Sequence, residues 1–149
     1  MAGSKPTTDQ RSEPPTTDDE RSLLTAFLDR QRETLVRKCA GLSDEQLRLH
    51  AVPSSKLTRI GLVRHLALVE WWWLQNVIAG EHPPEPYCAT GDRDEDFNDI
   101  GSATGESACA IWRAQVEQSW RMVTDRSLDA AGSAAPHAYP YRGPGSPRS

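Results

Sequence analysis

Several features that mark other classes of protein are missing or scarce in this sequence. Its 149 residues include three cysteines, widely spaced and without a C-x-x-C pair, which gives no sign of a zinc or disulfide framework. No basic run is interleaved with aromatic residues, and the formal net charge is -4. Because phosphate binding needs a clustered basic surface, we expect no nucleic-acid partner. Hydrophobic residues reach only 37%, below the usual globular share, so we expect part of the chain to be unfolded.

Targeting and membrane segments are also missing. Residues 1–6 are polar and do not resemble the apolar core of a signal peptide. The longest apolar stretch is interrupted by Arg64, His65 and Glu70, so it does not qualify as a membrane span. Together with the unpaired cysteines, these absences predict a cytoplasmic protein without a membrane partner.

The most informative segment is residues 61–74, which place one histidine in a helix that is apolar on nearly every side. At about 100° per residue, His65 shares a face with Leu62, Val69 and Trp72. Such a helix must be buried by several neighbours or by a partner chain. The pattern alone favours a core histidine that is satisfied by a hydrogen bond.

Helix-capping signals place the first elements. Residues 1–16 are rich in Thr, Ser, Pro and charge, which predicts a disordered leader. Thr17 and Glu20 have the spacing of a capping box and start a helix that Gly41 can close. Ser43 and Gln46 repeat the capping signature and predict a short helix.

A second long helix is expected at about residues 58–79, with a stop at Gly80. The segment 81–105 has neither a strand nor a helix period and is predicted to be a long loop. Its carboxylates lack the glycine and the terminal glutamate of an EF-hand loop, so a solvated acidic loop is favoured over a metal site. The carboxylates are those of Asp92, Asp94, Glu95 and Asp96.

A third long helix is expected from about residue 104 or 106 to residue 124, with an apolar stripe that includes Trp112 and Trp120. After residue 130 the prolines and glycines forbid a long helix. The chain is therefore divided into a disordered leader (1–16), a helical domain (17–129) and a disordered Pro/Gly-rich tail (130–149).

Several short motifs follow one another in the helical domain. They are Asp19-Glu20-Arg21, Phe27-Leu28-x-x-Gln31-Arg32, Gly41-Leu42-Ser43-Asp44-Glu45-Gln46, Val52-Pro53-Ser54, Gly61-Leu62-Val63-Arg64-His65-Leu66, Trp73-x-Gln75-x-Val77-Ile78-Ala79-Gly80 and Asp94-x-Asp96-Phe97. This succession resembles the DinB-like four-helix-bundle proteins, in the branch near mycothiol-dependent maleylpyruvate isomerase. The resemblance implies an all-α, DinB-like up-down-down-up helical bundle.

The resemblance also implies a site. In this family three histidines hold a divalent metal, taken as zinc or nickel, and a small-molecule thiol such as mycothiol or bacillithiol is the co-substrate. His65 matches the metal ligand in the G-L-x-x-H-L segment. The other two ligands form an H-x-x-x-H pair on a fourth long helix, and His50, His82 and His137 do not have that spacing. The sequence thus lacks the fourth long helix and its two histidine ligands. Without these ligands the chain can have lost the metal as well. The helical period ends after Leu128, which suggests a truncated, frame-shifted or divergent copy.

Two functions are weighed. The first is a metal-dependent, thiol-linked transferase of the DinB-like type, catalytically incomplete in this chain because a catalytic zinc normally has three protein ligands. The alternative is a non-catalytic, self-associating helical protein, such as a homodimer, because a bundle one helix short leaves apolar faces uncovered. Of the consecutive tryptophans Trp71, Trp72 and Trp73, at least one is expected to lack cover. Membrane-surface association ranks lower, since the helix expected at residues 58–79 offers only Arg59 and Arg64 as basic residues.

Overall fold

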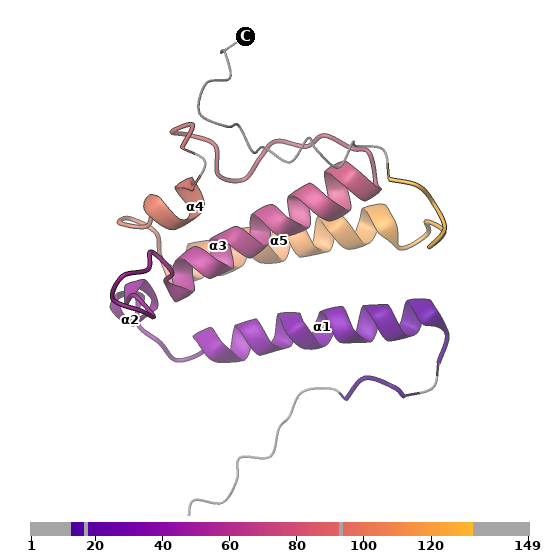
Figure 1. Cartoon of the computed structure of the whole chain (residues 1–149), viewed down its shortest axis with the longest axis horizontal. Helices are drawn as coiled ribbons and strands as arrows, with labels where there is room; N and C mark the ends of the chain where they lie inside the picture. The colour runs from indigo at the N-terminus through magenta and orange to yellow at the C-terminus, as the bar shows by residue number, and fades with distance from the viewer. Residues whose placement is uncertain (1–12, 17, 93, 133–149) are drawn as a thin grey trace, which may run out of the picture. The chain divides into compact units, whose positions relative to one another are not determined.

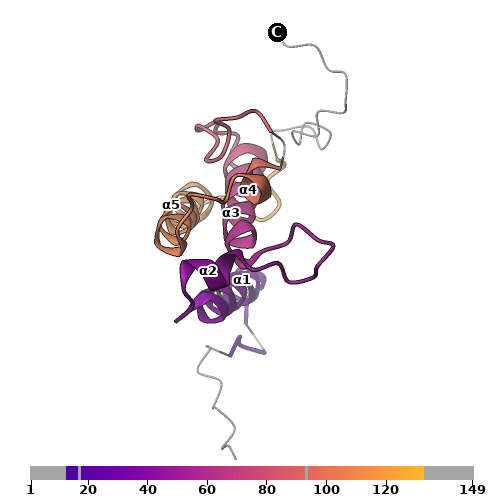
Figure 2. The same cartoon turned by 90° about the vertical axis from the view of Figure 1, so that its left-hand side faces the viewer.

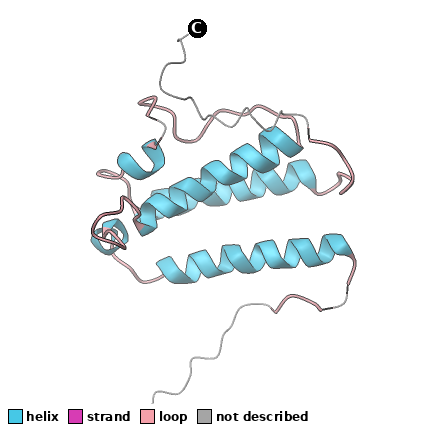
Figure 3. Ribbon diagram, in the orientation of Figure 1, coloured by secondary structure: helices cyan, strands magenta, loops and turns pink. Residues whose placement is uncertain are grey.

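The computed structural model of the chain describes residues 13–16, 18–92 and 94–132. Within them the protein is all-α, as predicted, and no strand occurs (Figure 3). The helical segments, in chain order, are α1 (Glu20–Cys39), α2 (Asp44–Arg48), α3 (Arg59–Val69), η1 (Glu70–Ile78), α4 (Glu95–Asn98) and α5 (Gly105–Val123) (Figure 1). No helix of this described part is long and apolar enough to cross a membrane. The chain divides into two compact units, residues 1–40 and 41–149.

The first unit contains α1, whose N-terminus is capped by Asp19. The Asp19 carboxylate accepts a hydrogen bond from the Ser22 backbone N–H at 3.2 Å. Hydrogen bonds from the Ser22 hydroxyl and backbone hold the pKa of Asp19 below its ordinary value. The prediction that Thr17 caps this helix is wrong, because the charged Asp19 satisfies the first-turn amide itself. After the last turn, Gly41 has a φ of 72°, the left-handed conformation expected of the residue that closes a helix.

The second unit begins with α2, which starts as predicted. Ser43 and Gln46 form a reciprocal capping box. In addition, the Asp44 carboxylate accepts a hydrogen bond from the backbone N–H of Gly105 at 2.7 Å. The Arg48 guanidinium donates to backbone carbonyls of the segment that precedes α5. The short helix α2 is thereby tied to the start of α5.

The predicted long helix at residues 58–79 is confirmed, as α3 followed without a break by η1. The Thr58 hydroxyl caps it by accepting from the Gly61 N–H at 3.0 Å. Its second half, η1, has the wider π-helical geometry, which the hydrophobic pattern did not indicate. Gly80 follows with a φ of 73°, so the predicted stop is correct.

Helix α5 forms the core of this unit by packing against both α3 and η1 (Figures 1 and 2). The prediction of an amphipathic helix here is confirmed, because Ala108, Trp112 and Ser119 are buried. The apolar core of the described residues consists of Leu47, Ile60, Val63, Ala67, Trp71, Trp72, Tyr87, Ala103, Ala108 and Trp112.

A polar group lies inside this apolar interface. The Gln75 side chain is fully buried, and its Nε2 donates to Ser119 Oγ at 3.2 Å and to the Gln115 side-chain oxygen at 2.9 Å. The Ser119 hydroxyl also bonds to the Glu70 backbone carbonyl at 3.3 Å. The bonds of Gln75 Nε2 therefore tie η1 to α5, while Gln75 Oε1 is buried without a hydrogen-bond partner among the described residues.

The prediction of a loop without helix over residues 81–105 is wrong for Glu95–Asn98, which form the single turn α4. One turn is too short to produce a hydrophobic period, so the sequence pattern could not reveal it. Helix α4 packs against α3 at Gly61, where a Cβ atom would lie 2.7 Å from Phe97 Cδ1. The missing side chain of Gly61 therefore permits the close approach of the two helices.

Candidate functional site

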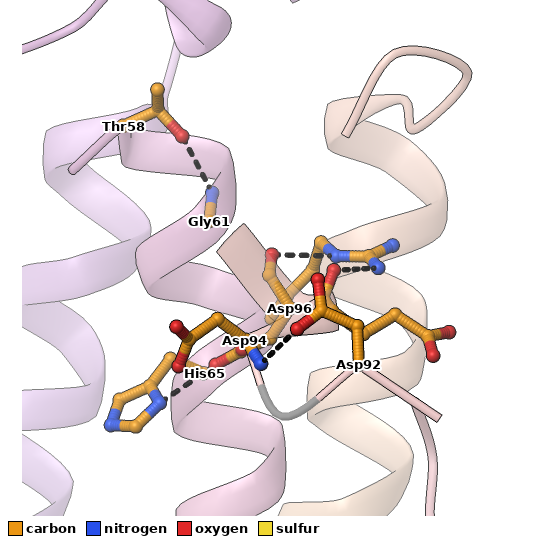
Figure 4. Close-up of polar contacts among 8 residues, drawn as sticks. Thr58, Gly61, His65, Asp92, Asp94 and Asp96 are labelled. Carbon is orange, nitrogen blue, oxygen red and sulfur yellow. Dashed lines mark hydrogen bonds and ion pairs between the residues drawn. The ribbon is translucent and has the colours of Figure 1, made fainter. Parts of the chain in front are cut away.

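His65 is paired with a buried carboxylate. Its Nδ1 lies 2.8 Å from Asp96 Oδ2, and the two side chains are 36% and 3% exposed (Figure 4). Since a carboxylate only accepts, a neutral His65 donates its Nδ1–H to Asp96, which leaves the lone pair on Nε2. The predicted hydrogen bond is present, but the prediction of a core position is wrong, because the imidazole is partly open to solvent.

Asp96 is held in place through the backbone of α4. The Arg64 guanidinium donates from Nε to the Asp96 carbonyl at 2.9 Å and from a terminal nitrogen to the Glu95 carbonyl at 3.1 Å. Arg64 is itself buried, with its guanidinium 4.0 Å from the centre of the Tyr87 ring. Arg64 thus binds the backbone of α4, and the adjacent His65 binds the Asp96 side chain of the same helical turn.

Glu95 fixes the loop in front of α4. Its carboxylate accepts hydrogen bonds from the Ala89 N–H at 3.1 Å and from the Thr90 N–H and hydroxyl, both at 2.7 Å. Burial alone raises the pKa of Glu95, but these hydrogen bonds and the charge of Arg64 outweigh it, so the pKa lies below the ordinary value.

The prediction of a solvated acidic loop is therefore wrong for half of its carboxylates. Glu95 and Asp96 are buried, whereas Asp92 and Asp94 are exposed. The Asp92 carboxylate accepts from the Asn98 side-chain amide at 2.7 Å, and this bond, followed by the one from the Asp94 N–H, lowers the pKa of Asp92. The acidic run divides into a buried inner pair and an outer pair.

The described residues bring no three metal-ligating side chains together. The Asp96–His65 pair is the carboxylate–imidazole arrangement that commonly orients a metal-ligating histidine. Elsewhere His50 Nδ1 bonds to the Ser55 carbonyl at 2.8 Å, and His82 Nδ1 to Asn76 Oδ1 at 3.0 Å. No group of three His, Cys, Asp or Glu side chains among the described residues could hold a metal ion, and His137 lies outside them.

A hollow of about 240 Å³ lies between the segment that precedes α3 and the start of α4. It is lined by Ser55, Lys56, Leu57, Asp94 and Phe97. The Phe97 ring also contacts the imidazole of His65, with the ring centres 5.2 Å apart. Phe97 thus contacts the imidazole of His65 and also lines the hollow.

Sequence reasoning identified His65 but missed Arg64, Asp96 and Phe97. One signal was available. A guanidinium in an apolar helix needs buried acceptors, but the acceptors of Arg64 are the backbone carbonyls of Glu95 and Asp96, a kind of group that every residue carries. Nothing in the sequence indicated which of the four carboxylates of the acidic run would turn inward.

Comparison with known proteins bears on the family. Residues 23–148 match the family model of mycothiol-S-transferase. Neither the curated proteins nor the solved structures gave a match. The match covers most of the chain and confirms the DinB-like resemblance that its motifs indicated. The chain belongs to the mycothiol-S-transferase family.

Proposed function

We propose that this chain carries the scaffold of a thiol-linked, mycothiol-type transferase, that His65 is a ligand position for a divalent metal such as zinc or nickel, and that one chain alone does not complete the metal centre. The observation that carries the proposal is the Asp96–His65 pair. The buried carboxylate fixes the Nδ1 tautomer and the ring orientation, which leaves Nε2 free to bind a cation or a substrate.

The chain offers fewer metal ligands than a catalytic site requires. A catalytic zinc site normally takes three protein ligands, and His65 is one. The four histidines of the sequence, at positions 50, 65, 82 and 137, include no pair four residues apart. Further ligands would have to come from outside the described residues or from a second chain.

The alternative function, a non-catalytic self-associating protein, is favoured by one observation. Trp71 and Trp72 are each 8% exposed, whereas Trp73 on the same helix is 47% exposed. The expectation that one of the three tryptophans lacks cover is thus confirmed. Leu62 and Ile78 of the same helix are also exposed. Exposed apolar surface of this kind favours association with a second copy.

Metal analysis tests the first proposal. The purified chain is loaded with zinc or nickel, desalted and analysed for bound metal, together with His65→Ala and the matched control His50→Ala. We expect less than one metal per chain, a further decrease in His65→Ala and no change in His50→Ala. One firmly bound metal per chain would overturn the claim of an incomplete centre, and equal metal content in His65→Ala would overturn the ligand assignment.

An activity measurement accompanies it. The chain is assayed for transfer of mycothiol to an electrophile, with and without added metal. We expect no turnover by the isolated chain above the uncatalysed rate. Metal-dependent turnover that disappears in His65→Ala would show a complete enzyme and contradict the proposal.

A further inference from the structure

We infer that the hollow lined by Lys56, Asp94 and Phe97 binds a small zwitterionic molecule with an apolar body, whose carboxylate pairs with Lys56 and whose ammonium pairs with Asp94. As the substrate site of a transferase this inference rests on the proposed function, but as a binding site it depends only on the hollow. Its volume of about 240 Å³ is below the roughly 300–1,000 Å³ of common ligand pockets, so it suits a ligand of amino-acid size.

The two charged groups of the hollow come from different segments and are not neutralised by each other. Lys56 precedes α3, and Asp94 directly precedes α4. No hydrogen bond or salt bridge of the Lys56 ammonium or the Asp94 carboxylate occurs among the described residues, and Asp94 does not use its side chain to cap α4. Two opposite charges that are left open at one cavity match a ligand that carries both signs.

The carboxylate of Asp92, by contrast, already has hydrogen-bond partners within the protein. Asp92 accepts hydrogen bonds from Asn98 and from the backbone of Asp94, and it feels the charge of Lys56 only through space. Asp94 is therefore the outer carboxylate that remains available to a ligand. A ligand with negative charge only would be repelled by Asp94 and Asp92, and one with positive charge only by Lys56.

The rest of the lining is mostly apolar, and for this reason we infer a ligand with an apolar body. Leu57 and Phe97 line the hollow, and the Phe97 ring lies 5.2 Å from the imidazole of His65. Figure 4 shows the Asp94 carboxylate and the His65 ring on the same side of the cluster. A ligand held by its two charges would rest its apolar part on Phe97, one ring away from His65.

The experiment uses three related probes and the full chain without added metal or thiol. L-phenylalanine carries both charges, phenethylamine lacks the carboxylate and 3-phenylpropionate lacks the ammonium. Binding is followed by NMR titration of the backbone amides. We expect L-phenylalanine to bind with a Kd on the order of 1 mM, with shifts at residues 55–57 and 94–97, and each of the other probes to bind about fivefold more weakly.

Charge reversal locates the site. Lys56→Glu and Asp94→Lys should each weaken the binding of L-phenylalanine by about fivefold, and the double variant should restore it, because the ligand can bind in the opposite sense. Circular dichroism checks that these surface variants fold. Absence of binding at about 20 mM L-phenylalanine, well above the expected Kd, equal binding of the three probes, or indifference to the single reversals would each overturn the inference.

The outcome is separable from that of the proposed function. His65→Ala should bind L-phenylalanine as the unchanged chain does, because His65 does not line the hollow. Binding of the zwitterion by a chain that fails the metal and transfer predictions would contradict the proposed function and leave this site in place. If L-phenylalanine does not bind while the metal and transfer measurements come out as predicted, this site is contradicted and the proposed function still stands.

Discussion

The guanidinium of Arg64 lies 4.0 Å from the centre of the Tyr87 ring while its nitrogens bind the carbonyls of Glu95 and Asp96. One buried cation thus joins helix α3, the segment after η1 and helix α4. Because three partners depend on it, the geometry of the His65 site depends on Arg64 without any direct contact between Arg64 and the imidazole.

Replacing Arg64 by methionine, which keeps the apolar stem and removes the charge, should destabilise the fold. Arg64 makes two hydrogen bonds from a charged donor, which contribute about 1.5–3 kcal/mol each, so we expect the free energy of unfolding to fall by about 3–6 kcal/mol. Urea denaturation measures it. The exposed Arg113 of α5 provides the control: Arg113→Met should cost less than about 0.5 kcal/mol. Equal effects of the two variants would show that Arg64 is not an anchor.

Asp96→Asn should change the tautomer of His65. In the native protein the carboxylate draws the proton to Nδ1, and the amide of asparagine removes that preference. The nitrogen chemical shifts of the imidazole, recorded for the neutral histidine, distinguish the two tautomers. His50, whose Nδ1 faces the Ser55 carbonyl, serves as internal reference and should not change. A His65 spectrum identical in both proteins would contradict the assigned hydrogen bond.

The fold was predictable from the sequence where local signals decide it. The capping box of Ser43 and Gln46 and the glycines that close helices, Gly41 and Gly80, mark boundaries that the structure confirms. These features act within a few residues, so the sequence contains their full cause. The position of Asp19 rather than Thr17 as the first cap shows the limit, because several neighbouring residues were capable of the same role.

The site was predictable only in part, for a physical reason. Asp96 is 31 residues away from His65, and the pair forms only because α4 docks on α3 at Gly61. That docking depends on Arg64, Glu95 and the space at Gly61 together. None of these three contributions produces a periodic or local pattern in the sequence. The sequence therefore indicated the histidine and not its partner.

Gly61→Ala tests this docking. The new methyl group would lie 2.7 Å from Phe97 Cδ1 and 3.0 Å from Thr58 Oγ1, so α4 or the Phe97 ring must move. Overpacking of this kind typically costs about 1–3 kcal/mol, and we expect a loss of that size in the free energy of unfolding.

Two controls accompany the glycine variant. At Gly101 an added methyl group would meet no other atom within 4 Å, so Gly101→Ala should be nearly neutral. In the double variant Gly61→Ala with Phe97→Ala the clash is absent, and the combined cost should be smaller than the two separate costs added. Simple additivity would show that the contact with Phe97 is not the cause.

Acid should destabilise the protein through Glu95. The folded-state pKa of Glu95 lies below its ordinary value of 4.5, so the ionised carboxylate favours the folded state. This contribution is fully present above pH 4.5 and is lost as the pH falls through the folded-state pKa. Urea unfolding from neutral pH down to about pH 3 should show a steeper loss of stability for the native chain than for Glu95→Gln. The exposed Glu106→Gln should follow the native profile, and a Glu95→Gln profile that also does so would refute the prediction.

The exposed Trp73 should determine whether the chain associates with a second copy. Trp73 is 47% exposed on η1, next to the buried Trp72. Burial of apolar surface contributes about 25 cal/mol per Å², so covering one indole can add roughly 1–3 kcal/mol per chain to a dimer. We therefore expect a dimer in sedimentation at micromolar concentration, and at least a tenfold weaker dimer for Trp73→Gln. Leu128 has the same exposed fraction but lies after α5, so Leu128→Gln is a matched control that should associate as the native chain does. A compact native monomer at these concentrations would exclude self-association, and equal weakening by both variants would mean that general hydrophobicity, not the surface of η1, drives it.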